Sequence, residues 1–373
     1  MNASSQARLA RVRDLMAARG YDALALRNVS DLRWLTDAER VFDDECAHTA
    51  LVTAEGAWIH TDSRYFNALA ERLGQDSPWQ LDMGPETHPE WLARKASGLR
   101  LRVLAVEDTL TLGFFEELES ALSAVSCACL MPRLHGDLAV MRAVKDDAEV
   151  ALMRRAQAIT DAAFSHMCAW LRPGVTELQA RAELDGWMLS NGADSLSFGT
   201  IVASGPNTAN PHAQPGSRVI EPGDLVLMDY GAGLNGYKSD MTRTVVMGEP
   251  DERQRQLYDL VRSVNEACER EIRPGVSSRA VYDLSVRLIS EAGFGDFFKH
   301  GLGHGVGVDI HERPFLSARF DEPLAVGNVV TVEPGVYLPG FGGVRLEDYG
   351  VVTKGGYDVF TSSSHDLVCI KTR

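Results

Sequence analysis

Basic residues are scarce in this chain of 373 residues. It contains 37 Lys and Arg against 52 Asp and Glu, which gives a formal net charge of −15 at pH 7. Nucleic-acid binding needs a basic surface that faces the phosphates, and the Lys and Arg residues are too dispersed to form one. We therefore expect no nucleic acid among its partners.

Long hydrophobic runs are also missing. Apolar residues make up 45% of the chain, yet no segment reaches the run of about 18 apolar residues that a spanning helix needs. Residues 1–26 have an amphipathic pattern without the apolar centre of a signal peptide. The sequence thus predicts no membrane partner and a cytoplasmic location.

Cysteine is rare as well. The six cysteines are scattered, and only Cys127 and Cys129 are near neighbours, in a C-x-C that lacks a matching second pair. We expect reduced, mostly buried thiols. The chain also lacks G-K-S/T and G-x-S-x-G motifs, which argues against a phosphate-binding loop and a serine nucleophile.

The length of the chain exceeds the usual size of one hydrophobic core, which favours two domains. Up to about residue 135, short apolar stretches alternate with helical patterns. Strands are expected at 22–26, 48–53, 57–61 and 101–106, and helices at 4–20, 64–73, 89–96 and 112–122. This alternation predicts a smaller α/β domain over residues 1–135 and a second domain over residues 136–373.

The second domain contains two similar phrases, LRPGVTE ending at Glu177 and IRPGVSS ending at Ser278. Each follows one helical pattern and precedes another, at 146–171 and 177–190 in the first copy and at 251–272 and 277–292 in the second. The similarity indicates an internal duplication, in which each half supplies two helices followed by strands. We expect an α+β fold with a pseudo-twofold repeat and its ligands on a central sheet.

Four carboxylates and one imidazole lie in short motifs of this second domain. The segments LVLMDYGAG, GYKSDMTRT, HGLGHGVGVDIHERP, VVTVEPGVY and GGVRLEDYG carry, in this order, Asp229, Asp240, His304, Glu333 and Glu347. Strands at 225–230 and 242–247 are expected to form a hairpin through Asn235-Gly236, with the two aspartates facing each other. Strands at 329–332 and 342–346 each lead to a glutamate.

Four carboxylates gathered in one pocket would repel one another and take up protons unless cations balanced them. Two divalent ions would balance the four charges. Oxygen ligands with a single imidazole suit Mn²⁺, Co²⁺ or Fe²⁺, and Zn²⁺ less well. A hydroxide between two such ions is a nucleophile at neutral pH, so the motifs predict a hydrolytic dinuclear metal centre.

The order of the motifs resembles that of the pita-bread metallopeptidases, the family of prolidase (Xaa-Pro dipeptidase) and Xaa-Pro aminopeptidase. The motifs are D-Y-G, G-Y-x-S-D-x-T-R-T, H-G-x-G-H-x-x-G-x-x-x-H-E, V-E-P-G and R-x-E-D, within residues 146–369. Residues 1–135 resemble the creatinase-type N-terminal domain of that family. The resemblance implies a pita-bread catalytic domain, two divalent metal ions and a homodimer; the ligand types favour Mn²⁺ or Co²⁺ for these ions. It also implies a peptide substrate with proline at the second position.

The resemblance assigns roles to the five residues. It implies that Asp229 chelates one ion, that Asp240 and Glu347 bridge both ions, and that His304 and Glu333 complete the second. Glu333 would also move a proton from the bridging water to the leaving nitrogen.

Two further histidines match substrate positions of the family. His212, in NPHAQPG, and His311 would contact the substrate and stabilise the tetrahedral intermediate by donating an N–H to its oxyanion. The alternative for His212 is an ordinary loop histidine before a turn.

Three arginines are candidates for supporting roles. Arg345, two residues before Glu347, is expected to orient that carboxylate or else to pair at a strand edge. Arg319 resembles the position at which prolidases hold the C-terminal carboxylate of a dipeptide, and Arg313 is its rival. A solvated loop arginine is the alternative for both.

The preferred function is hydrolysis of the Xaa-Pro bond of dipeptides, favoured by Arg319 and by the modest length of the chain. The first alternative is an Xaa-Pro aminopeptidase acting on longer peptides. The others are a metal-free creatinase-like hydrolase and a non-catalytic pita-bread module that binds peptides. The sequence leaves the metal, the preferred first residue and the oligomeric state open.

Overall fold

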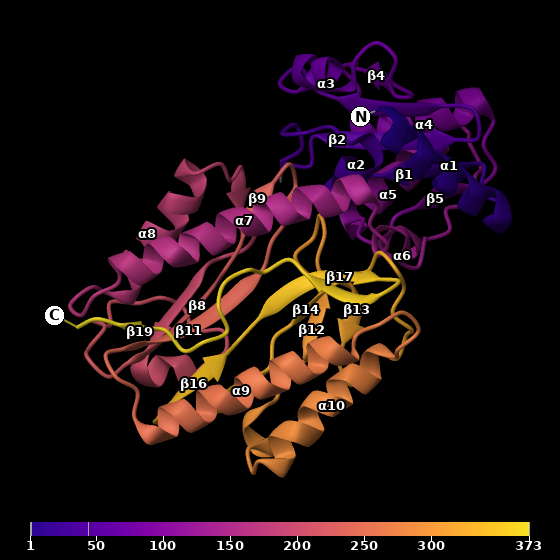
Figure 1. The fold of residues 1–373 in the computed structure, drawn as a ribbon. Helices are drawn as coiled ribbons and strands as arrows, with labels where there is room; N and C mark the ends of the chain where they lie inside the picture. Colours follow the sequence, from indigo (N-terminus) through magenta and orange to yellow (C-terminus); the bar gives the residue numbers. More distant parts are fainter. Residues whose placement is uncertain (1, 44, 373) are drawn as a thin grey trace. The chain divides into compact units, whose positions relative to one another are not determined.

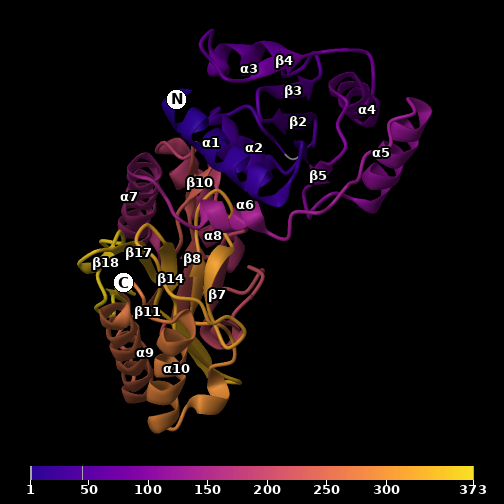
Figure 2. The same cartoon turned by 90° about the vertical axis from the view of Figure 1, so that its right-hand side faces the viewer.

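The computed structural model describes residues 2–43 and 45–372 and divides into two compact units, Met1–Met141 and Arg142–Arg373 (Figures 1 and 2). The sequence places the domain boundary earlier, between residues 135 and 136, and that position stays a prediction. Most of the short helix α6 (Asp137–Arg142) lies between this predicted boundary and the boundary of the compact units.

The N-terminal unit is built on one mixed sheet of five strands in the order β4-β3-β2-β1-β5. The central strands are antiparallel, whereas β4 and β5 run parallel to their neighbours. The strands are β1 (Ala23–Leu26), β2 (His48–Thr53), β3 (Ala57–Thr61), β4 (Gln80–Asp82) and β5 (Leu104–Val106). The helices are α1 (Asn2–Arg19), α2 (Val29–Thr36), α3 (Phe66–Leu73), α4 (His88–Leu99) and α5 (Leu112–Ala124).

These elements confirm the expected α/β architecture. The buried side chains of α4 and α5, such as Trp91 and Leu118, pack with strand residues such as Leu104 into one hydrophobic core. The sequence interpretation missed α2, which is only two turns long, and β4, which has three residues and a sparsely buried pattern. Elements this short leave too few periods to be recognised.

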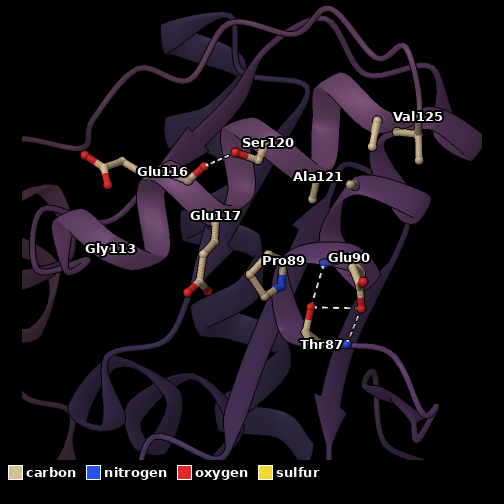
Figure 3. Close-up of a pocket in the computed structure, with 11 residues that line it drawn as sticks. Thr87, Pro89, Glu90, Gly113, Glu116, Glu117, Ser120, Ala121 and Val125 are labelled. Carbon is tan, nitrogen blue, oxygen red and sulfur yellow. Dashed lines mark hydrogen bonds between the residues drawn. The ribbon is translucent and has the colours of Figure 1, made fainter.

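A cavity of about 790 Å³ lies between α4 and α5 of this unit (Figure 3). Thr87 and Glu90 line it and form the capping box of α4, and the Ser120 hydroxyl donates to the carbonyl of Glu116. These polar groups of the lining thus form hydrogen bonds within α4 and α5. The ionisable residues of its lining are the glutamates Glu90, Glu116 and Glu117.

The C-terminal unit contains the four long helices expected from the duplicated pattern. They are α7 (Asp147–Trp170), α8 (Glu177–Ser190), α9 (Glu252–Glu271) and α10 (Ser278–Glu291). Asp146, Thr176 and Asp251 begin the first three helices with capping boxes, and Ser277 caps the fourth. Figure 1 shows α7 and α8 on one side of the strands and α9 and α10 on the other.

Two principal sheets lie between these helix pairs. The first has the order β19-β11-β8-β7 and the second the order β13-β12-β14-β17-β18. Their strands are β7 (Ile201–Ser204), β8 (Leu225–Tyr230), β11 (Met241–Met247), β12 (Gly303–Gly305), β13 (Glu312–Leu316), β14 (Val329–Val332), β17 (Asp348–Thr353), β18 (Gly356–Val359) and β19 (Cys369–Ile370). The smaller pairings involve β6 (Ser195–Leu196), β9 (Ala232–Leu234), β10 (Tyr237–Lys238), β15 (Gly335–Leu338) and β16 (Gly342–Arg345).

The duplicated phrases occupy equivalent places in the fold. The amide of Gly174 donates to the carbonyl of Ile220 in the first half (2.9 Å), and the amide of Gly275 donates to that of Leu324 in the second (2.8 Å). Each half also has its own hydrophobic core, one around α7 and α8 and the other around α9 and α10. The pseudo-twofold pita-bread architecture is therefore confirmed.

The cysteines differ in part from the expectation. All six are free thiols, but only Cys268 is buried. Cys46 and Cys369 are exposed and the others are half-buried, so the expectation of mostly buried thiols is wrong. Across the described residues, no helix combines the length and the hydrophobicity needed to cross a bilayer.

Candidate active site

The two aspartates come from neighbouring strands of the first half. Asp229 lies in β8, and Asp240 directly precedes β11. The antiparallel register places Asp229 opposite Thr242, so Asp240 is displaced by two residues from the facing position that we expected. Because residues two apart in a strand share a face, all three side chains still point to the same side of the sheet.

The predicted Asn-Gly turn belongs to a smaller hairpin. Asn235 and Gly236 have φ values of 51° and 85° and connect β9 to β10. These left-handed conformations suit a tight two-residue turn. The turn shortens the connection between β8 and β11, and this connection brings Asp240 back toward Asp229.

The other three residues come from the second half. His304 is in the middle of β12, Glu333 follows β14, and Glu347 lies between β16 and β17. β12 pairs with β14, and β14 pairs with β17. This sheet therefore brings together residues that are far apart in the sequence.

One cavity of about 440 Å³ collects the side chains from both halves. Nε2 of His304 lies 3.6 Å from an oxygen of Asp240 and 3.4 Å from an oxygen of Glu333. Asp240, His304 and Glu347 each offer one ligand atom within 4.8 Å of the others. Asp229 and Glu333 line the same cavity, as do His212, His300, His311 and Arg345.

The imidazole of His304 presents a lone pair to the carboxylates. Its Nδ1 lies 3.1 Å from the carbonyl oxygen of Gly305, which can only accept, so Nδ1 carries the hydrogen. Burial and the neighbouring His311 lower the pKa of His304 to about 3. The ring is therefore neutral near pH 7, with the lone pair of Nε2 directed at Asp240 and Glu333.

The carboxylates are destabilised as anions. Burial raises the pKa of Asp240 and of Glu347 well above the usual range, and the neighbouring carboxylates raise both further. Burial also raises the pKa of Glu333 to about 8. One oxygen of Asp229, Oδ1, is buried without a hydrogen-bond partner in the described part of the chain.

This donor set fits divalent cations. Cations would balance the crowded carboxylates, accept the lone pair of His304 and give the unpartnered oxygen of Asp229 a ligand. The predominance of oxygen donors favours hard or borderline ions over the soft ions that thiolates select. The geometry of the site thus agrees with the chemistry that the motifs suggest.

Arg345 reaches into the same cavity. Its guanidinium forms an ion pair with Asp229 and donates hydrogen bonds to the hydroxyls of Tyr337 (2.9 Å) and Thr242 (3.0 Å). The Thr242 hydroxyl donates in turn to Glu347 (2.7 Å). Arg345 therefore contacts Asp229 directly and reaches Glu347 through Thr242; the sequence suggested that it orients Glu347 and did not reveal its contact with Asp229.

The histidines lie on the wall of the cavity. The ring of His311 meets that of His304 edge-on, with 4.3 Å between centroids. His212 is exposed on the loop that follows β7, and His300 hydrogen-bonds Tyr337 (3.0 Å). Burial lowers the pKa of His311, and His212, which lines the same cavity, lowers it further.

The two substrate arginines proposed from the sequence are not among the residues that line the cavity. Arg313 pairs with Glu322 (3.3 Å) and stacks over the ring of Phe320. Arg319 is exposed on the following loop. A role for either residue in holding a substrate carboxylate stays a prediction.

The motifs did not reveal several residues of the site. Tyr337 and Thr242 link Arg345 to its neighbours, and Phe198, Ile310 and Phe315 form an apolar part of the wall. Thr242 had a signal in the sequence, because it lies two residues after Asp240 in a strand. The apolar residues look like ordinary core positions, so only the fold identifies them.

Comparisons with known proteins match both parts of the chain. Residues 151–354 match the family described as metallopeptidase family M24. Residues 8–144 match the family described as the creatinase/prolidase N-terminal domain. An Xaa-Pro dipeptidase of Pyrococcus horikoshii is 34% identical over 268 residues, which are 72% of this chain and 75% of that protein.

Two solved structures have the same fold. An Xaa-Pro dipeptidase from Bacillus anthracis is 34% identical with a TM-score of 0.91, covering 98% of this chain and 99% of the other. An X-Pro aminopeptidase from Thermotoga maritima is 29% identical with a TM-score of 0.87, covering 97% and 100%. Together with the site, these matches show that the chain belongs to metallopeptidase family M24, with a creatinase/prolidase-type N-terminal domain.

Proposed function

We propose that this protein is a metal-dependent exopeptidase that hydrolyses the Xaa-Pro bond of dipeptides. The observation that carries the proposal is the single cavity in which four carboxylates and a neutral imidazole lie beside His212 and His311. The similarity to Xaa-Pro dipeptidases of Pyrococcus horikoshii and Bacillus anthracis supports the choice of substrate.

Asp229, Asp240, His304, Glu333 and Glu347 would hold two divalent cations, with Mn²⁺ or Co²⁺ as the proposed metals. Such cations would offset the carboxylate charges and lower the pKa of a bound water molecule. Asp240 and Glu347 are the most deeply buried of the carboxylates that would hold them.

Four further roles concern the transferred proton, the negative charge of the intermediate and the orientation of a metal ligand, and we assign them to Glu333, His212, His311 and Arg345. Glu333 borders the cavity, where its carboxylate is placed to accept a proton and pass it to the leaving nitrogen. His212 and His311 supply N–H donors to the oxygen that becomes negative during attack on the carbonyl. Arg345 holds Asp229 in place.

The shape of the cavity suits a small substrate that contains proline. Its volume of about 440 Å³ is within the usual range for a small-molecule site. Phe198, Ile310 and Phe315 offer an apolar surface to a pyrrolidine ring. The Xaa-Pro bond has no N–H, so an enzyme that recognises it depends on such contacts and on the carbonyl oxygen.

Replacing Asp240 with Asn tests the metal-dependent reaction. We expect the protein to bind Mn²⁺ and to hydrolyse Xaa-Pro dipeptides, and Asp240→Asn to lose most of both properties because a charged ligand is removed. Metal content and dipeptide hydrolysis are the two measurements, and Asp296→Asn, an exposed aspartate outside the cavity, is the matched control. A folded wild-type protein that neither binds metal nor hydrolyses the dipeptide would instead favour a peptide-binding module.

The second candidate function is an Xaa-Pro aminopeptidase, favoured by the likeness to the Thermotoga maritima enzyme. We expect faster hydrolysis of Xaa-Pro than of Xaa-Pro-Xaa.

We also expect Arg319→Ala or Arg313→Ala to raise KM for the dipeptide by about tenfold, because a charge-assisted contact with its carboxylate is lost. The measurement is kcat and KM for both substrates, and faster turnover of the tripeptide would establish the aminopeptidase.

We also propose a homodimer in the cytoplasm. Six unpaired cysteines suit a reducing compartment. Light scattering at several protein concentrations would measure the mass of the assembly, and a constant monomer mass would rule out the dimer.

A further inference from the structure

Glu177 is a buried carboxylate outside the cavity, with only 1% of its surface exposed. It is the first residue of α8 and accepts four hydrogen bonds. Its Oε1 accepts from the amide of Ser204 (2.8 Å), the hydroxyl of Ser204 (2.9 Å) and the side-chain amide of Asn207 (3.0 Å). Its Oε2 accepts from the amide of Gly216 (3.1 Å).

These partners are the two ends of one loop. Ser204 is the last residue of β7, and Gly216 lies twelve residues later, beyond His212. A single carboxylate thus holds the start of the loop with one oxygen and its end with the other. Arg218 strengthens the start, because its guanidinium donates to the Ser204 hydroxyl (2.6 Å) while pairing with Asp224 (2.6 Å).

The loop determines where the imidazole of His212 lies. Within the described residues, the His212 side chain forms no hydrogen bond of its own, and its backbone amide meets only the Asn210 side chain (3.3 Å). The carbonyl of the preceding Pro211 accepts from Arg345 (3.3 Å). The position of the ring therefore follows from the backbone that Glu177 and Arg345 hold.

The second half of the fold serves as an internal comparison. Ser278 occupies the repeat position of Glu177, at the start of α10. Its hydroxyl makes two longer contacts, with the carbonyl of Phe320 and the amide of Glu322, both at 3.3 Å. A helix can thus begin at this repeat position without a carboxylate, so the fold does not require the four bonds of Glu177.

We propose that Glu177 is a positioning residue that holds the 204–216 loop so that His212 faces the reacting carbonyl. The proposal rests on the function proposed above for His212. Burying a carboxylate is costly unless its oxygens are well bonded, and here every bond goes to the loop. A shift of about 1 Å in a catalytic donor lowers rates on the order of 100-fold, so holding the loop matters to catalysis.

Glu177→Gln is the informative variant because it is nearly the same size. Glutamine keeps one acceptor oxygen but replaces the other with an NH₂ group, which cannot accept from an amide N–H. One end of the loop therefore loses its side-chain bond to residue 177, while the bond from the Leu178 amide to the Gly216 carbonyl (3.1 Å) and the capping box from Thr176 and Gln179 remain. Gln179→Ala is the matched control, since it removes the side-chain half of that capping box, the bond from the Thr176 amide, and leaves the loop contacts intact.

The experiment combines kinetics with hydrogen exchange on the metal-loaded full chain. We expect Glu177→Gln to lower kcat/KM for an Xaa-Pro dipeptide by about tenfold or more and to speed exchange of the amides in residues 204–216. Gln179→Ala should change neither. In a His212→Ala background, Glu177→Gln should cause no further loss, because the ring that it positions is already gone.

Any of four results would overturn the proposal. One is unchanged exchange in the loop of Glu177→Gln, and another is an equal loss of activity with and without His212. The third is full activity of His212→Ala, which would also remove the role proposed for His212. If Glu177→Gln alone proved harmless while Asp240→Asn was inactive, the proposed peptidase activity would stand without a role for Glu177.

Discussion

Arg345 brings a positive charge of the chain's own among the carboxylates. Its side chain is 3% exposed and meets four partners at once, Asp229, Thr242, Tyr337 and the carbonyl of Pro211. A guanidinium has five donors in a fixed plane and can serve several acceptors, whereas an ammonium is a compact charge on a flexible stem. The orientation of Asp229 therefore depends on the shape of this side chain as well as on its charge.

We expect Arg345→Lys to lower kcat/KM about 10- to 100-fold while the protein stays folded, because groups that orient metal ligands usually contribute this much. Steady-state kinetics and metal titration would measure the effect. Arg273→Lys, at an exposed arginine outside the cavity, is the control. Kinetics of Arg345→Lys equal to those of the control would show that charge alone suffices.

At the scale of elements, a buried ion pair joins the segment before α7 to β13. Nζ of Lys145 lies 2.5 Å from an oxygen of Glu312, and the two side chains are 1% and 2% exposed. Arg142 approaches the other oxygen of Glu312 at 3.7 Å. Glu312 directly follows His311, so this pair also fixes the end of the loop that carries a proposed substrate residue.

We expect Lys145→Met to lower the free energy of unfolding by about 3 kcal/mol, because it leaves a carboxylate buried without its closest partner. Lys145→Met combined with Glu312→Leu should recover much of that loss, since no buried charge then lacks a partner. Denaturant unfolding would measure both variants. Arg287→Ala breaks an exposed pair with Glu291 and should cost under about 1 kcal/mol; a similar cost for Lys145→Met would contradict the prediction.

At the scale of the whole molecule, the N-terminal unit has its own response to acid. Nδ1 of His60 and Nδ1 of His88 lie 2.8 Å apart, and the ring of His60 stacks on Trp91. Burial and the neighbouring His60 lower the pKa of His88 from 6.5 to about 4, and burial also lowers the pKa of His60. The folded unit therefore favours neutral rings.

The sign of the pH dependence follows from these shifts. Above pH 6.5 the rings are neutral in the folded and unfolded states, so the full stability is present. As the pH falls from 6.5 toward 4, the unfolded chain binds protons first, and the free energy of unfolding decreases. We expect thermal unfolding of the full chain to show this loss, and His88→Gln to reduce it; a melting temperature constant between pH 7 and 4.5 would contradict the prediction.

The sequence alone determined the local structure and the chemical types. Long amphipathic patterns and capping residues predicted α7 to α10, because periodicity and caps act over neighbouring residues. The repeated R-P-G-V phrases predicted the duplication for the same reason. The motifs also selected four carboxylates and one histidine, and the structure places all five on one cavity.

Only the tertiary structure decided how these residues meet. It placed Asp240 two residues away from the position opposite Asp229 and brought Arg345 into contact with Asp229. It also brought Glu177 into hydrogen-bonding contact with the loop that carries His212. The physical reason is that strand register and loop closure depend on packing between segments far apart in the chain. No local pattern encodes those distances, and so the apolar wall of the cavity was visible only in the fold.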